Sequence, residues 1–264
     1  MIKFFRNIRR SLLDRDRFSK YILYAIGEII LVVIGILIAL QINNWNEERK
    51  ANEKEVQLIE DLHNEFQKNY NELLVDIKRL ETVEKSNNEI LKLLQNPNPV
   101  ISEIELNRLI SKGLSTPTWN PSFFVMEELK NSGGFAKLNN TELKNTLLDW
   151  ERYYSNLREV EGSISNAFDR SLIFLIGEAA ARNIDAENED FNVGRSILPK
   201  KNKDLLKDFR FENHIDDMYI SSAHLLKTYY VARDKIEALL VLTKATEWYD
   251  FDASKTKTKA TFRE

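Results

Sequence analysis

The sequence predicts an all-α protein in which one N-terminal transmembrane helix continues into an elongated antiparallel helical bundle outside the cytoplasm. The chain has 264 residues, of which 43% are hydrophobic, but it contains only 8 Gly and 5 Pro. Both counts lie below the roughly 7% and 5% of an average protein, so few residues interrupt a helix. One early stretch is almost entirely apolar, and three later stretches repeat apolar residues in steps of three and four.

The composition also limits the chemistry that we expect. The absence of cysteine excludes disulfides, thiolate metal sites and cysteine nucleophiles. A net charge of -3 offers no general affinity for nucleic acid. The sequence contains no serine-elbow or kinase signature. We therefore predict a non-enzymatic protein without catalytic residues or cofactors.

Residues 21–42, YILYAIGEIILVVIGILIALQI, form the predicted transmembrane helix. At about 1.5 Å per residue they reach about 33 Å, enough to cross a hydrocarbon core of about 30 Å. Tyr21 and Tyr24 mark one interface and Trp45 the other, as in aromatic belts. The alternatives are a buried helix of a soluble protein and a cleaved signal peptide. Both fit less well, because apolar residues cover every face and no small-x-small cleavage site follows.

The segment before the span, residues 1–20, predicts the orientation of the chain. Its basic residues outnumber Asp14 and Asp16: Lys3, Arg6, Arg9, Arg10, Arg15, Arg17 and Lys20. The positive-inside rule then places the N-terminus in the cytoplasm of a bacterium and residues 43–252 in the periplasm, with the span in the inner membrane.

The same basic segment carries apolar residues at helical spacing: Met1, Phe5, Ile8 and Leu12. Such a pattern is typical of a basic amphipathic helix that lies on the anionic cytoplasmic leaflet. The alternative is that these charges only fix the topology.

One ionisable residue, Glu28, lies about 10 Å inside the predicted span. A carboxylate in lipid is costly, and such residues usually face protein or water.

At about 100° per residue, four residues of the span share an arc of about 60° on the helix: Glu28, Val32, Gly35 and Ala39. Gly35 and Ala39 form a small-x-x-x-small pair, which lets another helix approach closely. We predict that this face packs on a second membrane helix, from another copy or a different subunit. The alternative is that Glu28 extends to the cytoplasmic headgroups without a specific role.

Three long amphipathic helices are predicted within residues 43–252. The first runs from Trp45 to Gln95 without Pro or Gly, and the prolines that follow end it. The second covers about Thr141 to Asn183 and the third about Glu212 to Trp248, with an acidic linker over Asp185–Pro199. The last residues, 253–264, have almost nothing to bury and are predicted to be disordered.

Two short helices are predicted between the first and second long helices. Ser102 and Glu105 form a capping box for a helix that ends near Gly113. Asn120-Pro121 supplies an N-cap and a first-turn proline for a helix over Ser122–Asn131.

The long helices can bury their apolar faces most simply by forming an antiparallel bundle. In this path the first helix runs away from the membrane, the second returns and the third runs away again. This path places Pro97–Phe135 at the distal tip. Four aromatic residues would cluster there: Trp119, Phe123, Phe124 and Phe135. They predict either a partner-binding patch, since aromatic residues are enriched at interface hot spots, or a small cap over the end of the bundle.

A metal site is not expected. Glu60-x-x-His63 matches half of a di-iron carboxylate site, which needs a second Glu-x-x-His and two further glutamates. The other two histidines, His214 and His224, have Phe211 and Ser221 at the position where that motif needs glutamate.

Two blocks of sequence resemble a known family. They are GEIILVVIGILIALQINNWNE (27–47), with its entry FSKYILYAIGE, and ELKNSGGFAKLNNTELKNTLLDWERYY (128–154). In these blocks the chain resembles an uncharacterised family of single-pass inner-membrane proteins from Bacteroidota, a domain of unknown function. The resemblance implies an inner-membrane address and a helical extracytoplasmic domain, and it brings no activity, ligand or catalytic residue.

These observations predict a membrane-anchored helical scaffold or interaction protein that assembles as a homo-oligomer or with another membrane protein. One alternative is an energy- or signal-coupling subunit that uses Glu28, since proton-driven stator subunits also combine a carboxylate-bearing span with a periplasmic domain. A periplasmic ligand-sensing bundle is the other alternative.

Overall fold

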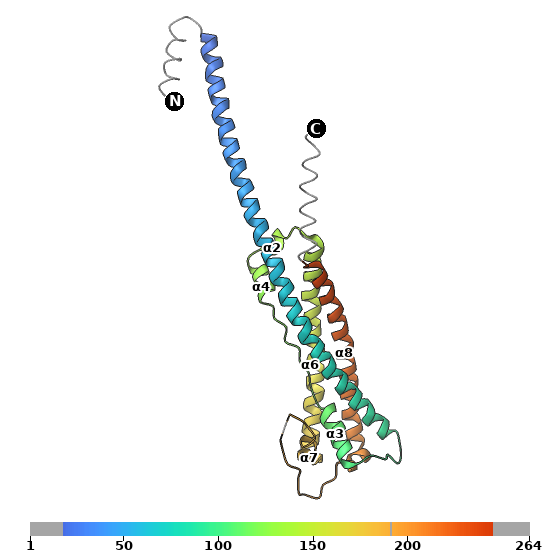
Figure 1. Ribbon diagram of the computed structural model, residues 1–264. Helices are drawn as coiled ribbons and strands as arrows, with labels where there is room; N and C mark the ends of the chain where they lie inside the picture. The colour runs from blue at the N-terminus through green and yellow to red at the C-terminus, as the bar shows by residue number, and fades with distance from the viewer. Residues whose placement is uncertain (1–17, 191, 245–264) are drawn as a thin grey trace. The chain divides into compact units, whose positions relative to one another are not determined.

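The computed structural model describes residues 18–190 and 192–244. Helices joined by turns and loops make up this part of the chain, and it contains no β-strand. The helices are α2 (Phe18–Leu94), α3 (Glu103–Gly113), α4 (Phe124–Asn131), α5 (Gly134–Lys137), α6 (Thr141–Glu178), α7 (Ala181–Asp185), the 3₁₀ helix η1 (Asn202–Lys207) and α8 (Phe209–Leu242) (Figure 1). The all-α prediction is confirmed. The predicted tail 253–264 lies outside the described residues, as does the predicted amphipathic segment 1–20 except where α2 begins.

The chain divides into two units, Met1–Gln57 and Leu58–Glu264. The described part of the first unit is helix α2 up to Gln57, and none of its described side chains is buried. This helix is apolar from Ile22 to Ile42 and polar beyond. Ion pairs within the polar part, such as Arg49 with Glu53 at 3.5 Å, join residues on successive turns and support an isolated helix.

The second unit has its own hydrophobic core, built by the later part of α2 with α6 and α8. Along each of these helices the buried residues follow one another in steps of three and four. On α2 the series is Ile59, Leu62, Phe66, Asn69, Leu73, Asp76, Leu80, Val83, Asn87 and Ile90. On α8 the series is Phe211, Ile215, Met218, Ser222, Leu225, Tyr229, Ala232, Ile236 and Leu239, and the buried Thr243 follows directly after the helix. Because the average step is about 3.5 residues, each helix keeps one stripe turned toward its neighbours along its whole length.

Helix α6 runs parallel to α2, whereas the predicted path made it return. Phe66, early in this part of α2, contacts Trp150, early in α6, with ring centroids 6.3 Å apart. Ile90, late in α2, and Leu175, late in α6, share a second core cluster. Both helices therefore start at the same end of the bundle.

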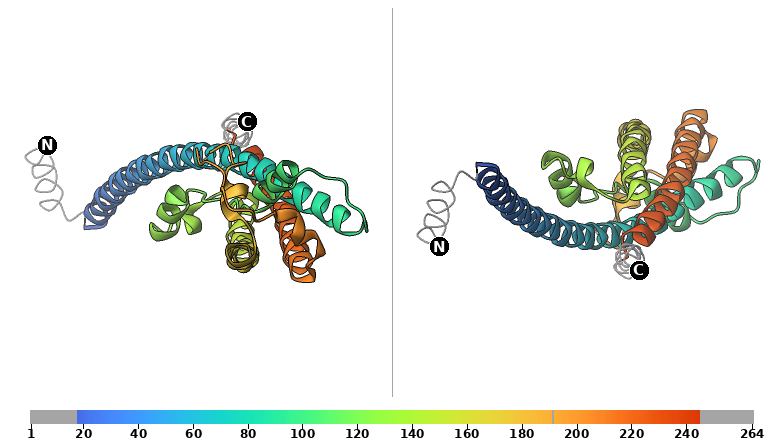
Figure 2. Two further views of the ribbon diagram at one scale, coloured as in Figure 1. Left: turned by 90° about the horizontal axis from the view of Figure 1, so that it is seen from below. Right: turned by 90° about the horizontal axis from the view of Figure 1, so that it is seen from above.

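Helix α8 runs antiparallel to both, whereas the predicted path made it parallel to the first helix. His63 Nδ1 of α2 lies 2.9 Å from Thr243 Oγ1, just after the end of α8. Phe211, at the start of α8, joins the cluster that contains Ile90. Figure 2 shows α6 and α8 side by side in end views, with α4 on the other side of α6.

The segment between α3 and α4 explains why the predicted path was wrong. Helix α3 packs into the cluster of Ile90, and Trp119, a few residues later, donates its indole N–H to the carbonyl of Asn69. The segment therefore returns along the bundle before α4 begins. A chain that makes this return can start its second long helix at the same end as the first. The predicted distal tip is consequently divided between the two ends of the bundle.

Candidate functional site

The predicted membrane face, Glu28, Val32, Gly35 and Ala39, lies on α2 in the first unit. Val32 is 54% exposed, and a methyl group added at Gly35 would meet no atom within 4 Å. Among the described helices, α2 is the one long and apolar enough to cross a membrane. Val32 and Gly35 are therefore open among the described residues, and the packing of this face on a second helix stays a prediction.

The four predicted tip aromatics do not form one exposed patch. Trp119 is completely buried, and Phe123 and Phe135 pack against the main core. Phe124 alone among the four counts as exposed, at 75%. Three of the four aromatic residues are thus packed into the second unit and do not offer an exposed aromatic surface.

Trp119 connects the three long helices of the second unit. Its indole N–H donates to the Asn69 carbonyl of α2 at 3.1 Å. Its backbone N–H lies 3.2 Å from Glu161 Oε1 of α6 and 3.1 Å from the Tyr229 hydroxyl of α8. The rings of Trp150, Tyr154 and Tyr229 meet the Trp119 ring edge-on, with centroids 5.9–6.5 Å apart, a favourable arrangement for aromatic pairs.

Glu161 is a carboxylate inside the helix seam, with its side chain 5% exposed. Its oxygens accept hydrogen bonds from the Tyr229 hydroxyl at 2.6 Å and from Arg158 at 2.5 Å. Burial raises the pKa of Glu161 above its usual value despite these donors. Burial, together with the hydrogen bond to Glu161, also raises the pKa of Tyr229.

A second buried carboxylate, Glu65 of α2, holds the start of α4. Glu65 accepts from the Ser122 hydroxyl at 2.8 Å, from the amide of Val125 at 3.1 Å and from the amide of Met126 at 3.3 Å. These amides belong to the first turn of α4, where N–H groups lack helical partners and a negative charge is favourable. The predicted N-cap Asn120 is therefore wrong, because the carboxylate that fills this role comes from another helix.

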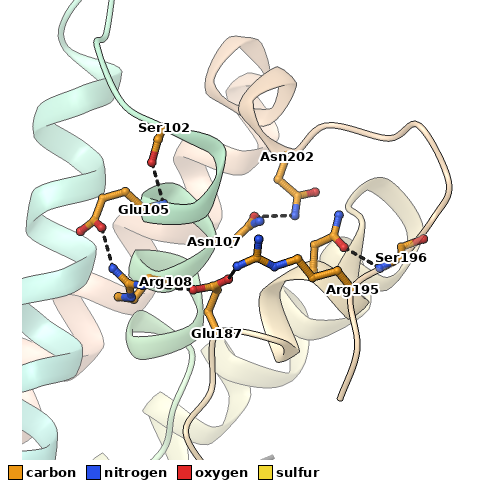
Figure 3. Close-up of polar contacts among 9 residues, drawn as sticks. Ser102, Glu105, Asn107, Arg108, Glu187, Arg195, Ser196 and Asn202 are labelled. Atoms are coloured by element: carbon orange, nitrogen blue, oxygen red, sulfur yellow. Dashed lines mark hydrogen bonds and ion pairs between the residues drawn. The ribbon is translucent and has the colours of Figure 1, made fainter. Parts of the chain in front are cut away.

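The other end of the bundle contains a polar cluster that joins α3 to the segment after α7 (Figure 3). Glu187 accepts from Arg108 at 3.3 Å and also pairs with Arg195. Asn202 donates to Asn107 at 2.8 Å and accepts from the amide of Ala180 at 2.7 Å. These bonds hold the segment between α7 and η1 against α3.

The predicted cap of α3 is present at the same end. Ser102 Oγ accepts from the amide of Glu105 at 3.1 Å, and the helix ends at Gly113.

Neither cluster brings together the side chains of a metal centre. Within residues 18–190 and 192–244, no group of three or more possible metal-binding side chains comes together. His63, half of the Glu-x-x-His motif, bonds Thr243 instead. The acids with a raised pKa, Glu161 and Asp76, are held by arginines of their own helices. We interpret the Trp119 cluster as a structural connection between helices.

Sequence reasoning missed the polar members of this connection. Asn69 and Glu161 occupy positions in mainly apolar series, Asn69 between Phe66 and Leu73. A polar residue at a buried position needs a partner, because an unmatched group costs free energy. That signal was present in the sequence, and the identity of the partners required the structure.

One known family matches a stretch that runs from within the predicted span to within α6. The model of the family of unknown function DUF6090 matches residues 28–172. The chain belongs to DUF6090. The DUF6090 match begins at Glu28 and includes Trp119 and Glu161, and it ends within α6. The predicted membership of a family of unknown function is thereby confirmed. No curated protein and no solved structure matches the chain.

Replacing Trp119 with Ala should destabilise the second unit strongly, while Phe124→Ala should not. Removal of a buried Trp costs about 3–5 kcal/mol of unfolding free energy, and surface changes stay within about 0.5 kcal/mol. Urea unfolding of the full chain in detergent, followed by circular dichroism, measures both variants. Equal effects of the two substitutions would contradict the buried position of Trp119.

Glu161→Gln should change how stability depends on pH. Because the folded-state pKa of Glu161 is raised, the native state binds more protons than the unfolded state from the usual carboxyl pKa of about 4.3 up to the raised value. The unfolding free energy of the wild type therefore falls as pH rises through this window, and the Gln variant lacks this loss. Gln keeps an oxygen that accepts from Trp119 and Tyr229.

We expect the Gln variant to gain stability relative to the wild type as the pH increases, measured by urea midpoints across the window. The pKa of Asp76 is also raised by burial, so part of the decrease of unfolding free energy with pH remains in both proteins. A constant difference between the two proteins at all pH values would show that Glu161 is not the group involved.

Proposed function

We propose that this protein is a non-enzymatic, membrane-anchored helical interaction protein of the bacterial inner membrane. In this proposal the early part of α2 crosses the bilayer and the second unit presents its surfaces to partners in the periplasm.

The observation that carries the proposal is the exposure of the apolar part of α2. Its exposed large apolar side chains are Ile22, Leu23, Ile26, Ile29, Ile30, Leu31, Val32, Val33, Ile34, Ile36, Leu37, Ile38, Leu40 and Ile42. Full transfer of one such side chain out of water is worth about 1.5–3 kcal/mol, and these side chains are 42–75% exposed, so the set amounts to roughly 10–25 kcal/mol. Domain stabilities are only about 5–15 kcal/mol. The segment therefore needs an apolar environment that the second unit, with its own core, does not supply.

Lipid fits this requirement better than a protein partner does. The exposed side chains cover every face of the helix, and a single partner helix would cover one stripe. A helix also satisfies its backbone amides internally, as a hydrocarbon environment demands. The basic residues of the segment 1–20 support a cytoplasmic N-terminus and hence a periplasmic second unit.

An interaction role is supported by how the titratable groups of the second unit are used. Glu161 and Asp76 have a raised pKa because they are buried in the helix seam. Glu161 accepts from Tyr229 and so connects α6 to α8, and Asp76 accepts from Arg79 of its own helix. Groups arranged in this way stabilise a scaffold on which partners can assemble.

Assembly within the membrane is proposed for the face of Glu28, Val32, Gly35 and Ala39. Small residues at positions 35 and 39 permit close approach of two helices. A carboxylate on the same face favours burial against protein, because exposure to hydrocarbon is costly.

Single cysteines test this face, since the chain has no cysteine of its own. Val32→Cys and Ala39→Cys should give disulfide-linked dimers in native membranes under mild oxidation. Ile30→Cys and Leu37→Cys lie about 180° away on the helix and are the matched controls. Equal crosslinking at all four positions, or none at 32 and 39, would contradict assembly through this face.

Glu28→Gln separates assembly from the energy-coupling alternative. A neutral side chain of the same size keeps the packing face, so crosslinking at Val32 should persist. If crosslinking persists and the cellular phenotype of a deletion strain is also rescued by the Gln variant, Glu28 does not transfer protons. Loss of rescue with intact crosslinking would favour the energy-coupling function.

A further inference from the structure

The segment from Ile197 to Phe209 combines exposed basic and apolar side chains at one end of the bundle. This segment includes η1, whose Leu205 packs into the cluster with Ile90. That cluster lies at the opposite end from His63 and Thr243, where α2 enters the second unit.

The segment is firmly attached to the bundle. The side chain of Asn202 is buried and bonds Asn107 and the backbone of Ala180. The Glu103 carboxylate accepts from the backbone amides of Asn202 and Lys203. Upstream, the Ser196 amide donates to Asn183 at 2.8 Å. Side chains on this segment are therefore presented to solvent from a fixed backbone.

Four lysines of the segment are exposed: Lys200, Lys201, Lys203 and Lys207. None of them forms an ion pair with another residue of the described chain. The neighbouring carboxylates have other partners. Asp208 and Glu178 pair with Arg210, and Glu103 holds backbone amides, which leaves Asp204 as the acid within this run of lysines.

Large apolar side chains flank these lysines. Ile197 is 99% exposed, Leu198 is 70% exposed and Phe209 is 71% exposed. Because the backbone holds these side chains in water, their burial against a partner would be favourable in free energy.

We propose that the segment Ile197–Phe209 binds the surface of an anionic lipid bilayer. Ile197 and Leu198 would enter the headgroup layer, and the lysines beside them would contact lipid phosphates. Lysines on flexible stems suit a fluid surface whose charges rearrange, whereas an acidic protein would need carboxylates at fixed positions. The proposal goes beyond membrane anchoring, because it assigns a lipid contact to the second unit itself, on residues outside the apolar helix.

Vesicle flotation tests the proposal. The full chain is placed in nanodiscs of phosphatidylcholine, so that the apolar helix has its own bilayer. It is then mixed with vesicles of phosphatidylcholine, with or without phosphatidylglycerol. We expect binding to the vesicles that contain phosphatidylglycerol and not to neutral ones. Equal binding to both vesicle types would overturn the proposal.

Removing the four lysines provides the first variant. Each Lys near an anionic surface contributes about fivefold to binding, so Lys200→Gln, Lys201→Gln, Lys203→Gln and Lys207→Gln together should weaken binding by at least about tenfold. The matched control changes the net charge equally at four exposed lysines elsewhere: Lys68, Lys78, Lys85 and Lys227. An equal loss in the control, or no loss in the first variant, would overturn the proposal.

Removing the apolar side chains provides the second variant. Ile197→Ser combined with Leu198→Ser should weaken vesicle binding several-fold without a change in circular dichroism. If the lysines matter and these two residues do not, the partner is a soluble polyanion or an acidic protein, and the lipid proposal fails. Failure here leaves the membrane anchor unaffected, because the nanodisc already holds α2.

Discussion

The exposed apolar helix is the constraint on which the account depends. From Ile22 to Ile42 the side chains of α2 are apolar except for Glu28 and Gln41, and none of them is buried. The second unit completes its own core with residues from Ile59 onward, so it has no need of the apolar segment. One continuous helix therefore combines two different requirements, an apolar surrounding for its first part and a helical partner for its last part.

Within the second unit, both the regular spacing of buried residues and a few polar contacts define the structure. Buried residues at steps of three and four align the helices, but the same spacing repeats along each helix, so spacing alone allows several registers. Trp119 contacts Asn69, Glu161 and Tyr229, which come from three different helices. These contacts are made at one register, because a shifted helix would leave buried polar groups without partners. We infer that the cluster selects the arrangement of the helices as much as it stabilises it.

The sequence predicted the local features well and the path of the chain poorly. The first long helix, the cap at Ser102 and the end of α3 at Gly113 follow from periodicity and capping, which are local properties. The parallel direction of α6 depends on a return segment that has no periodic pattern, so the apolar stripes could not reveal it. Glu65 illustrates the same limit, since it caps α4 from a distant part of the sequence. The sequence placed Trp119 in a cluster at the distal tip, because nothing local shows that its partners lie on three long helices.

Membership of DUF6090 leaves the biological role to physical argument, and lipid contact is the central part of that argument. Single cysteines along α2, labelled in native membranes with a membrane-impermeant maleimide, test it most directly. The account predicts protection at every position from Ile22 to Ile42, on all faces, and labelling at every position from Glu47 to Gln57. Labelling that rises and falls with helical periodicity within the apolar segment, or labelling throughout it, would contradict a helix surrounded by lipid.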